Sequence, residues 1–402
     1  MRRLGSPFIC ITTLVLASPA GAQQLGYDQH FFLRSEDGEA ELTIGGLFQF
    51  GANAFDGARD PSTDFDVRRM RLEFGVRAPG GFLAHLEPNF VPDDFEMEEA
   101  WVGFDMRDGD ARAMFGRMKA PFGLEEVRSR RGIDFARFSI LNQFSPAEDH
   151  GVFVNGRSRD RAWEYGCAVY NGTGDADTNS SKDVAARAMW HPFAPRAESA
   201  WTNLQFGVAG TTGRQDEDVG GDTIDNETGL AVVEFAPGVA LDGARTRVGL
   251  ESAWFHGPWF VQAEYLHAAQ EMSLAAADER IAIRGGYVSL AHVLTGEART
   301  FGGVAPAQPF DFRAWTGRGA WVVAARYSDL ALDSDLANAA LALPGTFTDR
   351  IRTYSLALNW IASRHVTLRH ALVHTDYADE VDLGDGSDDD EDAFLIELQL
   401  SF

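Results

Sequence analysis

The chain has 402 residues and a formal net charge of −25 at pH 7, from 60 acidic and 35 basic side chains. This acidity argues against nucleic acid as a partner, and two cysteines are too few for a disulfide framework. No segment beyond residue 22 reaches about 18 consecutive apolar residues, which excludes helical membrane spans.

Residues 1–22 have the three-part pattern of a secretory signal peptide. Arg2 and Arg3 precede the apolar stretch Pro7–Ala17, which is too short to cross a bilayer as a helix, and Ala20-Gly21-Ala22 fits the cleavage pattern. A buried N-terminal helix or a retained anchor is the alternative. We expect residues 1–22 to be removed on export and residues 23–402 to form one domain, with Cys167 as its single thiol.

Alternation of apolar and polar side chains fills the exported part of the chain. In the last segment the side chains at every second position from Phe394 to Phe402 are apolar, and this period of two predicts a half-buried strand. Sixteen such segments are present: Leu42–Phe55, Asp66–Arg77, Phe82–Phe90, Glu98–Arg107, Ala111–Lys119, Gly151–Gly156, Trp163–Tyr170, Val184–His191, Asn203–Thr211, Arg245–Phe255, Trp259–His267, Ile281–His292, Ala320–Leu330, Thr353–Ile361, Val366–Tyr377 and Ala393–Phe402.

Connection lengths favour sixteen strands over seventeen. A single-chain bacterial membrane barrel has an even number of strands, with short periplasmic turns and longer external loops. The tight links His256-Gly257-Pro258 and Ala362–Arg364 are then periplasmic, which places a seventeenth apolar segment, Leu230–Phe235, inside an external loop. On this count Thr295–Arg318 is an unusually long periplasmic link.

A soluble β-sandwich or propeller would also show alternation. No internal repeat supports a propeller, whereas the signal peptide, the terminal aromatic strand and the aromatic residues near strand ends favour a membrane barrel. We therefore predict an all-β, transmembrane, antiparallel up-and-down β-barrel of about 16 strands in the cell outer membrane. Its apolar side chains face lipid, and its polar side chains face a water-filled lumen.

Basic side chains on the polar face are the first candidates for solute contact. The planar guanidinium of arginine suits phosphate and carboxylate groups. For any single arginine, an ordinary solvated lumen residue that is paired across strands is the plainer interpretation. The arginines predicted to face the lumen are Arg69, Arg71, Arg77, Arg187, Arg326 and Arg369.

The third external connection, Ala120–His150, is long, and loops of this length are usually functional or disordered. We predict that it folds inward and narrows the pore with a ring of positive charge, which would select anions. The alternative is a solvated external loop whose arginines pair with Glu125, Glu126 and Asp134. The candidate anion-binding residues of this constriction are Lys119, Arg117, Arg128, Arg130 and Arg131.

Acidic residues gather in two other external connections, within 216–227 and 379–392. Such runs are most often solvated faces, with divalent-cation bridging to an anionic lipid surface as the alternative. The sequence has no EF-hand, G-x-S-x-G, H-E-x-x-H or P-loop pattern. We therefore predict neither an enzyme nor a cofactor nor a defined metal site.

The stretch Gly-Arg-Met-Lys-Ala-Pro-Phe-Gly-Leu-Glu-Glu at 116–126 resembles the G-x-x-K-x-P-F-G-L-E-E motif of the phosphate-selective porin O and P family. Shorter matches follow in the family's order at Leu294–Glu297, at Gly319–Trp321 with Ala325–Ser328, and at Leu358–Trp360. The resemblance implies a Gram-negative outer-membrane porin of sixteen strands, commonly a homotrimer, that passes phosphate or pyrophosphate. It also makes Lys119 the motif lysine.

Three functions stay open, because this chain is more acidic than the basic channel lining of the family's selective members would suggest. The first is passive diffusion of small phosphate-like anions. The second is a general, non-selective channel for small hydrophilic solutes, and the third is a surface-structural or adhesion barrel. In each case we expect outer-membrane lipid and lipopolysaccharide to surround the barrel.

Overall fold

The computed structural model describes residues 24–56, 62–91, 95–174, 177, 179–194, 199–275, 277–382 and 386–402. The predicted signal peptide, residues 1–22, lies outside this part of the chain. Within it, none of the helices has the length and apolar character needed to cross a bilayer.

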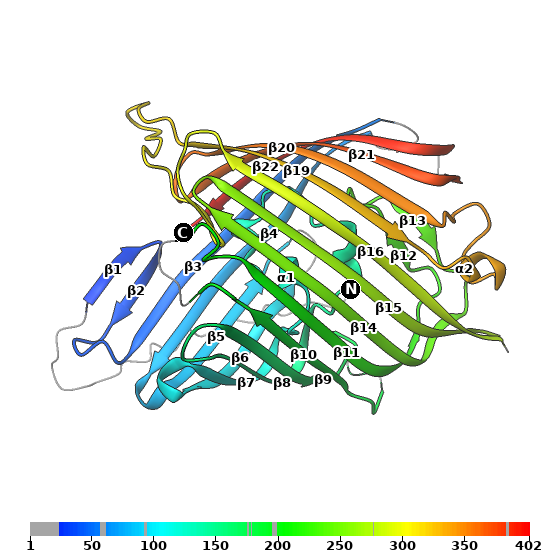
Figure 1. The fold of residues 1–402 in the computed structure, drawn as a ribbon, viewed down its shortest axis with the longest axis horizontal. Helices are drawn as coiled ribbons and strands as arrows, with labels where there is room; N and C mark the ends of the chain where they lie inside the picture. Colours follow the sequence, from blue (N-terminus) through cyan, green and yellow to red (C-terminus); the bar gives the residue numbers. More distant parts are fainter. Residues whose placement is uncertain are drawn as a thin grey trace, which may run out of the picture.

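Antiparallel strands form one large closed sheet (Figure 1). The sheet has 18 described strands, of which a short N-terminal hairpin, β1 and β2, lies outside the closed ring, so that the other 16 form the barrel. Pairing of β22 with β3 closes the ring. The barrel strands are β3 (Glu41–Phe55), β4 (Thr63–Ala78), β5 (Phe82–Asn89), β6 (Glu96–Met106), β7 (Ala111–Lys119), β8 (Glu148–Arg157), β9 (Trp163–Tyr170), β10 (Asp183–Trp190), β11 (Gln205–Asp218), β14 (Val239–His256), β15 (Trp259–Leu274), β16 (Ala277–Val293), β19 (Ala320–Ala331), β20 (Arg350–Ile361), β21 (Val366–Asp382) and β22 (Ser387–Ser401).

The predicted strand count is confirmed. Each of the sixteen predicted segments overlaps one barrel strand. The period-two pattern arises because a strand in the barrel wall has one face towards an apolar environment and the other towards a polar one. The seventeenth apolar segment contains β13 (Ala231–Glu234), which pairs with β12 (Thr223–Asp225) in a hairpin of its own. Connection length was therefore the right criterion for leaving it out of the barrel.

The two faces of the closed sheet differ in polarity as predicted. On β20, Leu356 and Leu358 are exposed, while their neighbours Ser355 and Asn359 are buried. In a closed sheet one face must look inward, so the exposed aliphatic face is the outer surface and the enclosed polar face lines the interior. The same outer face includes Val152, Val208, Leu250, Val288, Leu290, Leu372 and Phe394.

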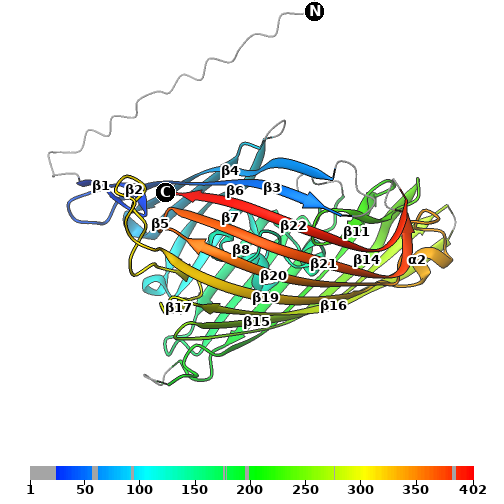
Figure 2. The same cartoon turned by 90° about the horizontal axis from the view of Figure 1, so that it is seen from above.

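One end of the barrel carries Phe402 and is here named the Phe402 end. The hairpin of β1 (Gln24–Asp28) and β2 (His30–Arg34) continues the sheet there, because β2 pairs with the first residues of β3, beyond the last residues of β22. Figure 2 shows this hairpin beside the C-terminus. The long β16–β19 connection also lies at this end and contains β17 (Arg299–Thr300) and β18 (Gly303–Val304).

The opposite end, here named the loop end, has an apolar core of its own. The β11–β14 connection and the β19–β20 connection, which contains α2 (Asp335–Asn338), pack there with the β7–β8 connection and with the inner face of the strands. The buried side chains of this core include Ile140, Leu141, Val232, Val233, Leu330, Leu336, Leu341 and Ile351. Three connections are therefore packed together at the loop end.

Candidate functional site

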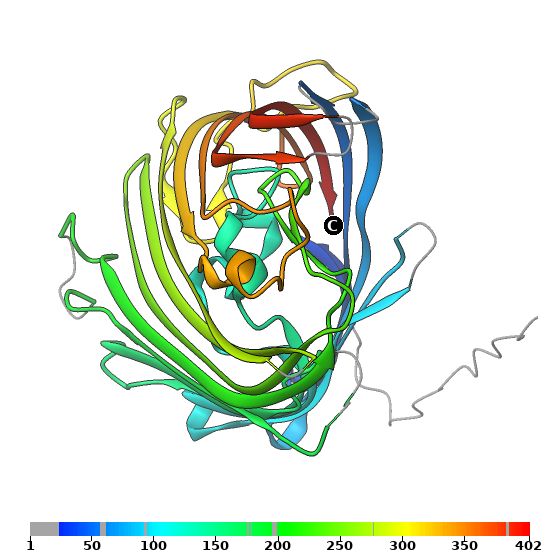
Figure 3. The same cartoon turned by 90° about the vertical axis from the view of Figure 1, so that its right-hand side faces the viewer.

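Residues 120–147, which connect β7 to β8, are here named the crossing segment. They contain α1 (Leu124–Val127) and the 3-10 helices η3 (Arg130–Gly132) and η4 (Ile140–Phe144). The segment contacts the inner face of strands on the far side of the ring from β7, among them β15, β19 and β21. Viewed from the loop end, its short helices lie within the outline of the strands (Figure 3).

The start of the crossing segment rests on glycines of the barrel wall. A Cβ atom at Gly166 would lie 2.9 Å from the Pro121 ring, and one at Gly249 would lie 3.1 Å from the buried Phe122 ring. Gly123 follows with a φ of 75°, which favours glycine. The Pro-Phe-Gly sequence is thus explained by close packing and by a turn into the lumen.

A carboxylate from β15 anchors the next turn. Glu264 accepts hydrogen bonds from the backbone N–H groups of Leu124 and Glu125, at 2.6 Å each. Nearby, Arg128 donates to Gln262 at 2.6 Å and to the carbonyl of Gly132 at 2.8 Å. The Arg128 guanidinium also lies over the rings of Phe260 and Phe301, so the contacts of this candidate residue hold the crossing segment in place.

Arg326 of β19 links the crossing segment to the wall through several contacts. Its side chain is 2% exposed and forms ion pairs with Glu125 at 3.2 Å and with Glu227 at 2.7 Å. It also donates to the carbonyls of Arg137 and Phe138. Glu227 comes from the β11–β14 connection, so one arginine joins three parts of the chain.

Arg369 of β21 performs a similar task nearer the Phe402 end. It donates to the carbonyls of Ile133 and Arg131, at 3.0 and 3.1 Å, and forms an ion pair with Glu397 at 2.5 Å. Burial of an arginine is favourable only when most of its donors find acceptors, and Arg326 lacks one at Nε. Two of the arginines predicted to face the lumen, Arg326 and Arg369, do face inward, but their guanidinium groups already donate to carboxylates and carbonyls of the protein.

A cavity of about 350 Å³ lies between β4 and the crossing segment and is here named the arginine cavity. Arg69 donates to Gln49 at 2.7 Å, and the Arg130 guanidinium lies 3.7 Å from the centre of the Phe138 ring. Asp66 is the acidic residue in the lining. The lining consists of Gln49, Asp66, Arg68, Arg69, Arg130, Ile133, Phe135, Ala136, Arg137 and Phe138.

Two of the four arginines in this lining, Arg68 and Arg137, were not among the predicted site residues. A β-bulge between Gln49 and Phe50 shifts the register of β4, so that Arg68 and Arg69 both turn inward. Arg68 donates to Asn53 at 2.8 Å and to the carbonyl of Ala136 at 2.7 Å. Strict alternation assigns Arg68 to the outer face, so the sequence pattern could not have found it.

The arginines of this cavity are only partly satisfied by the protein. The Nε atoms of Arg130 and Arg137 are buried and have no hydrogen-bond partner. Burial, together with the neighbouring Arg68 guanidinium, lowers the pKa of Arg137 to about 10, so Arg137 is still cationic at neutral pH. Asp66 pairs with Arg68 and Arg137, and Glu397 and Glu126 lie 3.4 and 3.5 Å from Arg68 and Arg130. The cavity therefore keeps an excess of positive charge and two unused donors.

The motif lysine lies among carboxylates and outside the arginine cavity. Lys119 contacts Glu126 at 3.1 Å and Glu148 at 3.9 Å, and it donates to the carbonyl of Glu126 at 2.7 Å. Burial alone would raise the pKa of Glu126, but Arg130 and Lys119 outweigh it and hold that pKa below its usual range. Lys119 is thus paired with a carboxylate that is ionised at neutral pH.

Two further predicted arginines are paired on the inner face. Arg71 binds Glu87 at 2.6 Å and Glu98 at 2.5 Å. Arg187 donates to Glu251 from Nε, at 3.0 Å to each carboxylate oxygen, and from a terminal guanidinium nitrogen at 2.6 Å. Pairing across strands, the alternative interpretation of the sequence, applies to both: Glu87 is on the strand next to Arg71, whereas Glu98 and Glu251 lie two strands away from their arginines.

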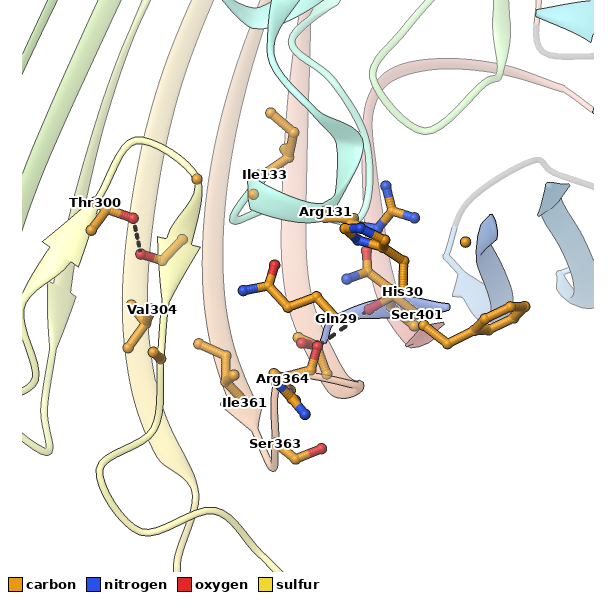
Figure 4. A pocket seen from close by; sticks show the side chains of 18 of the residues that line it. Gln29, His30, Arg131, Ile133, Thr300, Val304, Ile361, Ser363, Arg364 and Ser401 are labelled. Carbon is orange, nitrogen blue, oxygen red and sulfur yellow. Dashed lines mark hydrogen bonds between the residues drawn. The ribbon is translucent and has the colours of Figure 1, made fainter. Parts of the chain in front are cut away.

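Arg131 lines a second cavity, of about 560 Å³, at the Phe402 end (Figure 4). It forms an ion pair with Glu73 at 2.8 Å and donates to the carbonyl of Gly46 at 3.0 Å. His30 of the N-terminal hairpin and Arg364 of the β20–β21 turn line the same cavity. Arg130 and Arg131 are neighbours in the chain, but their side chains point in different directions and line different cavities.

Arg117 and Arg77 do not join either cavity. Arg117 shares a strand face with the exposed Phe115, which is the outer face, and donates to the carbonyls of Met97 and Gly174. Arg77 is exposed near the end of β4. The period-two rule that predicted β7 places Arg117 on the same side as Phe115, and the inclusion of Arg117 in the constriction stays a prediction.

Comparison with known proteins gives relatives of one kind. The family described as "Phosphate-selective porin O and P" matches residues 43–402. Porin O of Pseudomonas aeruginosa is 28% identical over 91% of this chain and 89% of its own length.

Among solved structures, the outer membrane channel DcaP of Acinetobacter baumannii has a TM-score of 0.58 at 10% identity, over 92% of this chain and 99% of that one. The trimer form of OmpT of Vibrio cholerae has a TM-score of 0.53 at 9% identity, over 90% of this chain and 99% of that one. These structures share the fold alone. The barrel, its apolar outer face and the family match together place the protein in the outer membrane as a channel, and the chain belongs to the phosphate-selective porin O and P family.

Proposed function

We propose that this outer-membrane channel serves the passive diffusion of small anions, with phosphate and pyrophosphate among its solutes, and that it catalyses no reaction. The observation that carries the proposal is the arginine cavity, in which four arginines and one acid surround about 350 Å³. Rings of arginine or lysine are a known means of selecting anions in pores.

The physical reason is the incomplete pairing of these arginines. A buried guanidinium whose donors lack partners is unfavourable, and an anion that enters the cavity supplies acceptors. Because Arg68, Arg69, Arg130 and Arg137 lie at one place, each unit of negative charge on the solute interacts with several cations. Phosphate, with several acceptor oxygens, would gain more than chloride.

The crossing segment gives the cavity its place in the path. Its ties to Arg326 and Arg369 hold it against the far wall, and Arg130 and Arg137 are thereby carried towards β4. We propose that solutes pass between the segment and the β4 side of the lumen, which makes the arginines the constriction. As in the trimer form of OmpT, three copies would assemble in the membrane.

Ion selectivity in planar bilayers tests the proposal. The wild-type channel, placed between unequal KCl solutions, should give a reversal potential of the sign expected for chloride preference, and added phosphate should reduce the chloride current. The double variant Arg69→Glu/Arg130→Glu should move the reversal potential towards cation preference. A matched control is Arg77→Glu/Arg117→Glu, which reverses the same number of charges outside the cavity and should leave the sign unchanged.

The same measurement addresses a general diffusion channel. The pairing of Arg71 and Lys119 with carboxylates favours this alternative, because it removes two of the predicted basic residues from contact with solute. A reversal potential near zero in the wild type, together with no effect of phosphate on the chloride current, would support non-selective diffusion and reject the anion channel.

A further inference from the structure

Five carboxylates gather on the inner side of β5, β6 and β8 and on α1, next to the arginine cavity. They are here named the carboxylate cluster and are Glu87, Glu98, Glu99, Glu126 and Glu148. Arg71 lies between Glu87 and Glu98, and Lys119 lies between Glu126 and Glu148. Arg130 lies at the edge of the cluster, 3.5 Å from Glu126, and His85 contacts Glu87 at 3.3 Å. Among the described residues, five acids thus face three permanent cations and one histidine, so the cluster carries an excess of negative charge.

Glu148 is the member of the cluster with an unused acceptor. Its side chain is 9% exposed, and its Oε1 atom has no hydrogen-bond partner. The Lys119 ammonium, at 3.9 Å, is too far for a hydrogen bond. A buried carboxylate oxygen that accepts no hydrogen bond can be stabilised by a ligand that donates an N–H group to it.

The carboxylate cluster and the arginine cavity share a boundary. Arg130 lines the arginine cavity and lies 3.5 Å from Glu126, and it is also a charged neighbour of Glu148. On β4, Arg69 lines the cavity, and Arg71, two residues further on, binds two members of the cluster. Groups of opposite charge thus lie next to each other in the lumen.

We propose that the constriction favours small phosphate or carboxylate compounds that also carry an ammonium group. The inference rests on the proposed anion path and adds a second point of recognition to it. The arginine cavity takes the anionic group, and the ammonium group donates to Glu148 and its neighbours in the carboxylate cluster. A compound with a single charged group can bind either the arginine cavity or the carboxylate cluster, and a neutral compound can form an ion pair with neither.

Block of the chloride current by two matched phosphates tests the inference. Phosphoethanolamine and ethyl phosphate are similar in size and share a phosphate monoester, but only the first carries an ammonium group. In the wild-type channel, phosphoethanolamine should reach half-block at a concentration several-fold lower than ethyl phosphate. In the isosteric double variant Glu98→Gln/Glu148→Gln this advantage should disappear, while block by ethyl phosphate should stay the same or strengthen.

A control variant removes the same charge elsewhere. Glu39 and Asp278 are exposed at the two ends of the barrel, so Glu39→Gln/Asp278→Asn should keep the wild-type preference for phosphoethanolamine. Equal block by both phosphates in wild type and in Glu98→Gln/Glu148→Gln would overturn the inference and leave the anion channel standing. Absence of block by either phosphate, with a reversal potential near zero, would overturn the anion channel itself and the inference with it.

Discussion

The arginines on the two sides of the crossing segment have different surroundings and therefore different uses. On the far wall, Arg326 and Arg369 meet carboxylates and carbonyls from several parts of the chain. On the β4 side, Arg69 and Arg130 have fewer partners and line a cavity with Arg137. The comparison teaches that the residue type alone does not define a solute site. An arginine supports the fold where it binds carboxylates and carbonyls from several parts of the chain, and it can bind a solute where it lines a cavity.

The largest effect is expected at Arg326, because its removal leaves two buried carboxylates without their cation. Arg326→Met should lower the free energy of unfolding by about 3–5 kcal/mol, the range found when one partner of a buried ion pair is removed. The measurement is urea unfolding of the refolded barrel in detergent. Arg69→Met is the comparison on the other side of the segment and should cost about 1 kcal/mol, as for a single hydrogen bond to a neutral partner.

Equal losses for Arg326→Met and Arg69→Met would break the distinction between the two groups of arginines. The channel gives a second readout for the same pair. Release of the crossing segment in Arg326→Met should make the single-channel current larger and less steady, whereas Arg69→Met should change selectivity at steady current.

A smaller effect is expected from removing one charge of the arginine cavity. Arg137→Gln should reduce the ratio of chloride to potassium permeability by a factor of about two to five, which corresponds to roughly 0.5–1 kcal/mol for one unit charge near water. The measurement is the reversal potential at low salt, and the difference from wild type should shrink in 1 M KCl, where the Debye length is about 3 Å. A salt-independent difference would indicate that Arg137 acts through the shape of the pore and not through its charge.

Acid should loosen the attachment of Arg130 and Lys119. Burial alone would raise the pKa of Glu126, but Arg130 and Lys119 lower it below the ordinary value of 4.5. A carboxyl group with a lowered pKa stabilises the fold fully above its unfolded-state pKa, and this contribution is lost as the pH falls through the folded-state pKa. We therefore expect Glu126→Gln to be less stable than wild type at pH 7 and to lose less stability between pH 7 and pH 3, as measured by urea unfolding. An unaltered pH profile in Glu126→Gln would show that Glu126 does not hold the segment through its charge.

The sequence predicted the barrel well and the site only in part, and the reason is the range of the interactions. Alternation is a local property, so all sixteen strands could be recognised from a few residues each. Arg326 and Glu125 are 201 residues apart, and no local pattern indicates that they pair. Arg68 was missed because one β-bulge reverses the alternation, and the ring contacts of Arg128 could not be foreseen because the rings lie on β15 and in the β16–β19 connection.

The smallest effect is expected at Arg117, which tests whether the face of a strand or nearness to the motif decides a residue's use. Arg117 lies two residues before Lys119 in the motif, but its guanidinium donates to the carbonyls of Met97 and Gly174 on the Phe115 side of β7. Arg117→Gln should lower the free energy of unfolding by about 1 kcal/mol, because two carbonyls lose their donor. It should leave the reversal potential unchanged, because no charge is removed from the path of the ions. A shift in reversal potential as large as that of Arg137→Gln would mean that the electric field of a charge on the outer face reaches the solute. The position of an arginine in the lining of the cavity would then not be sufficient to define the site.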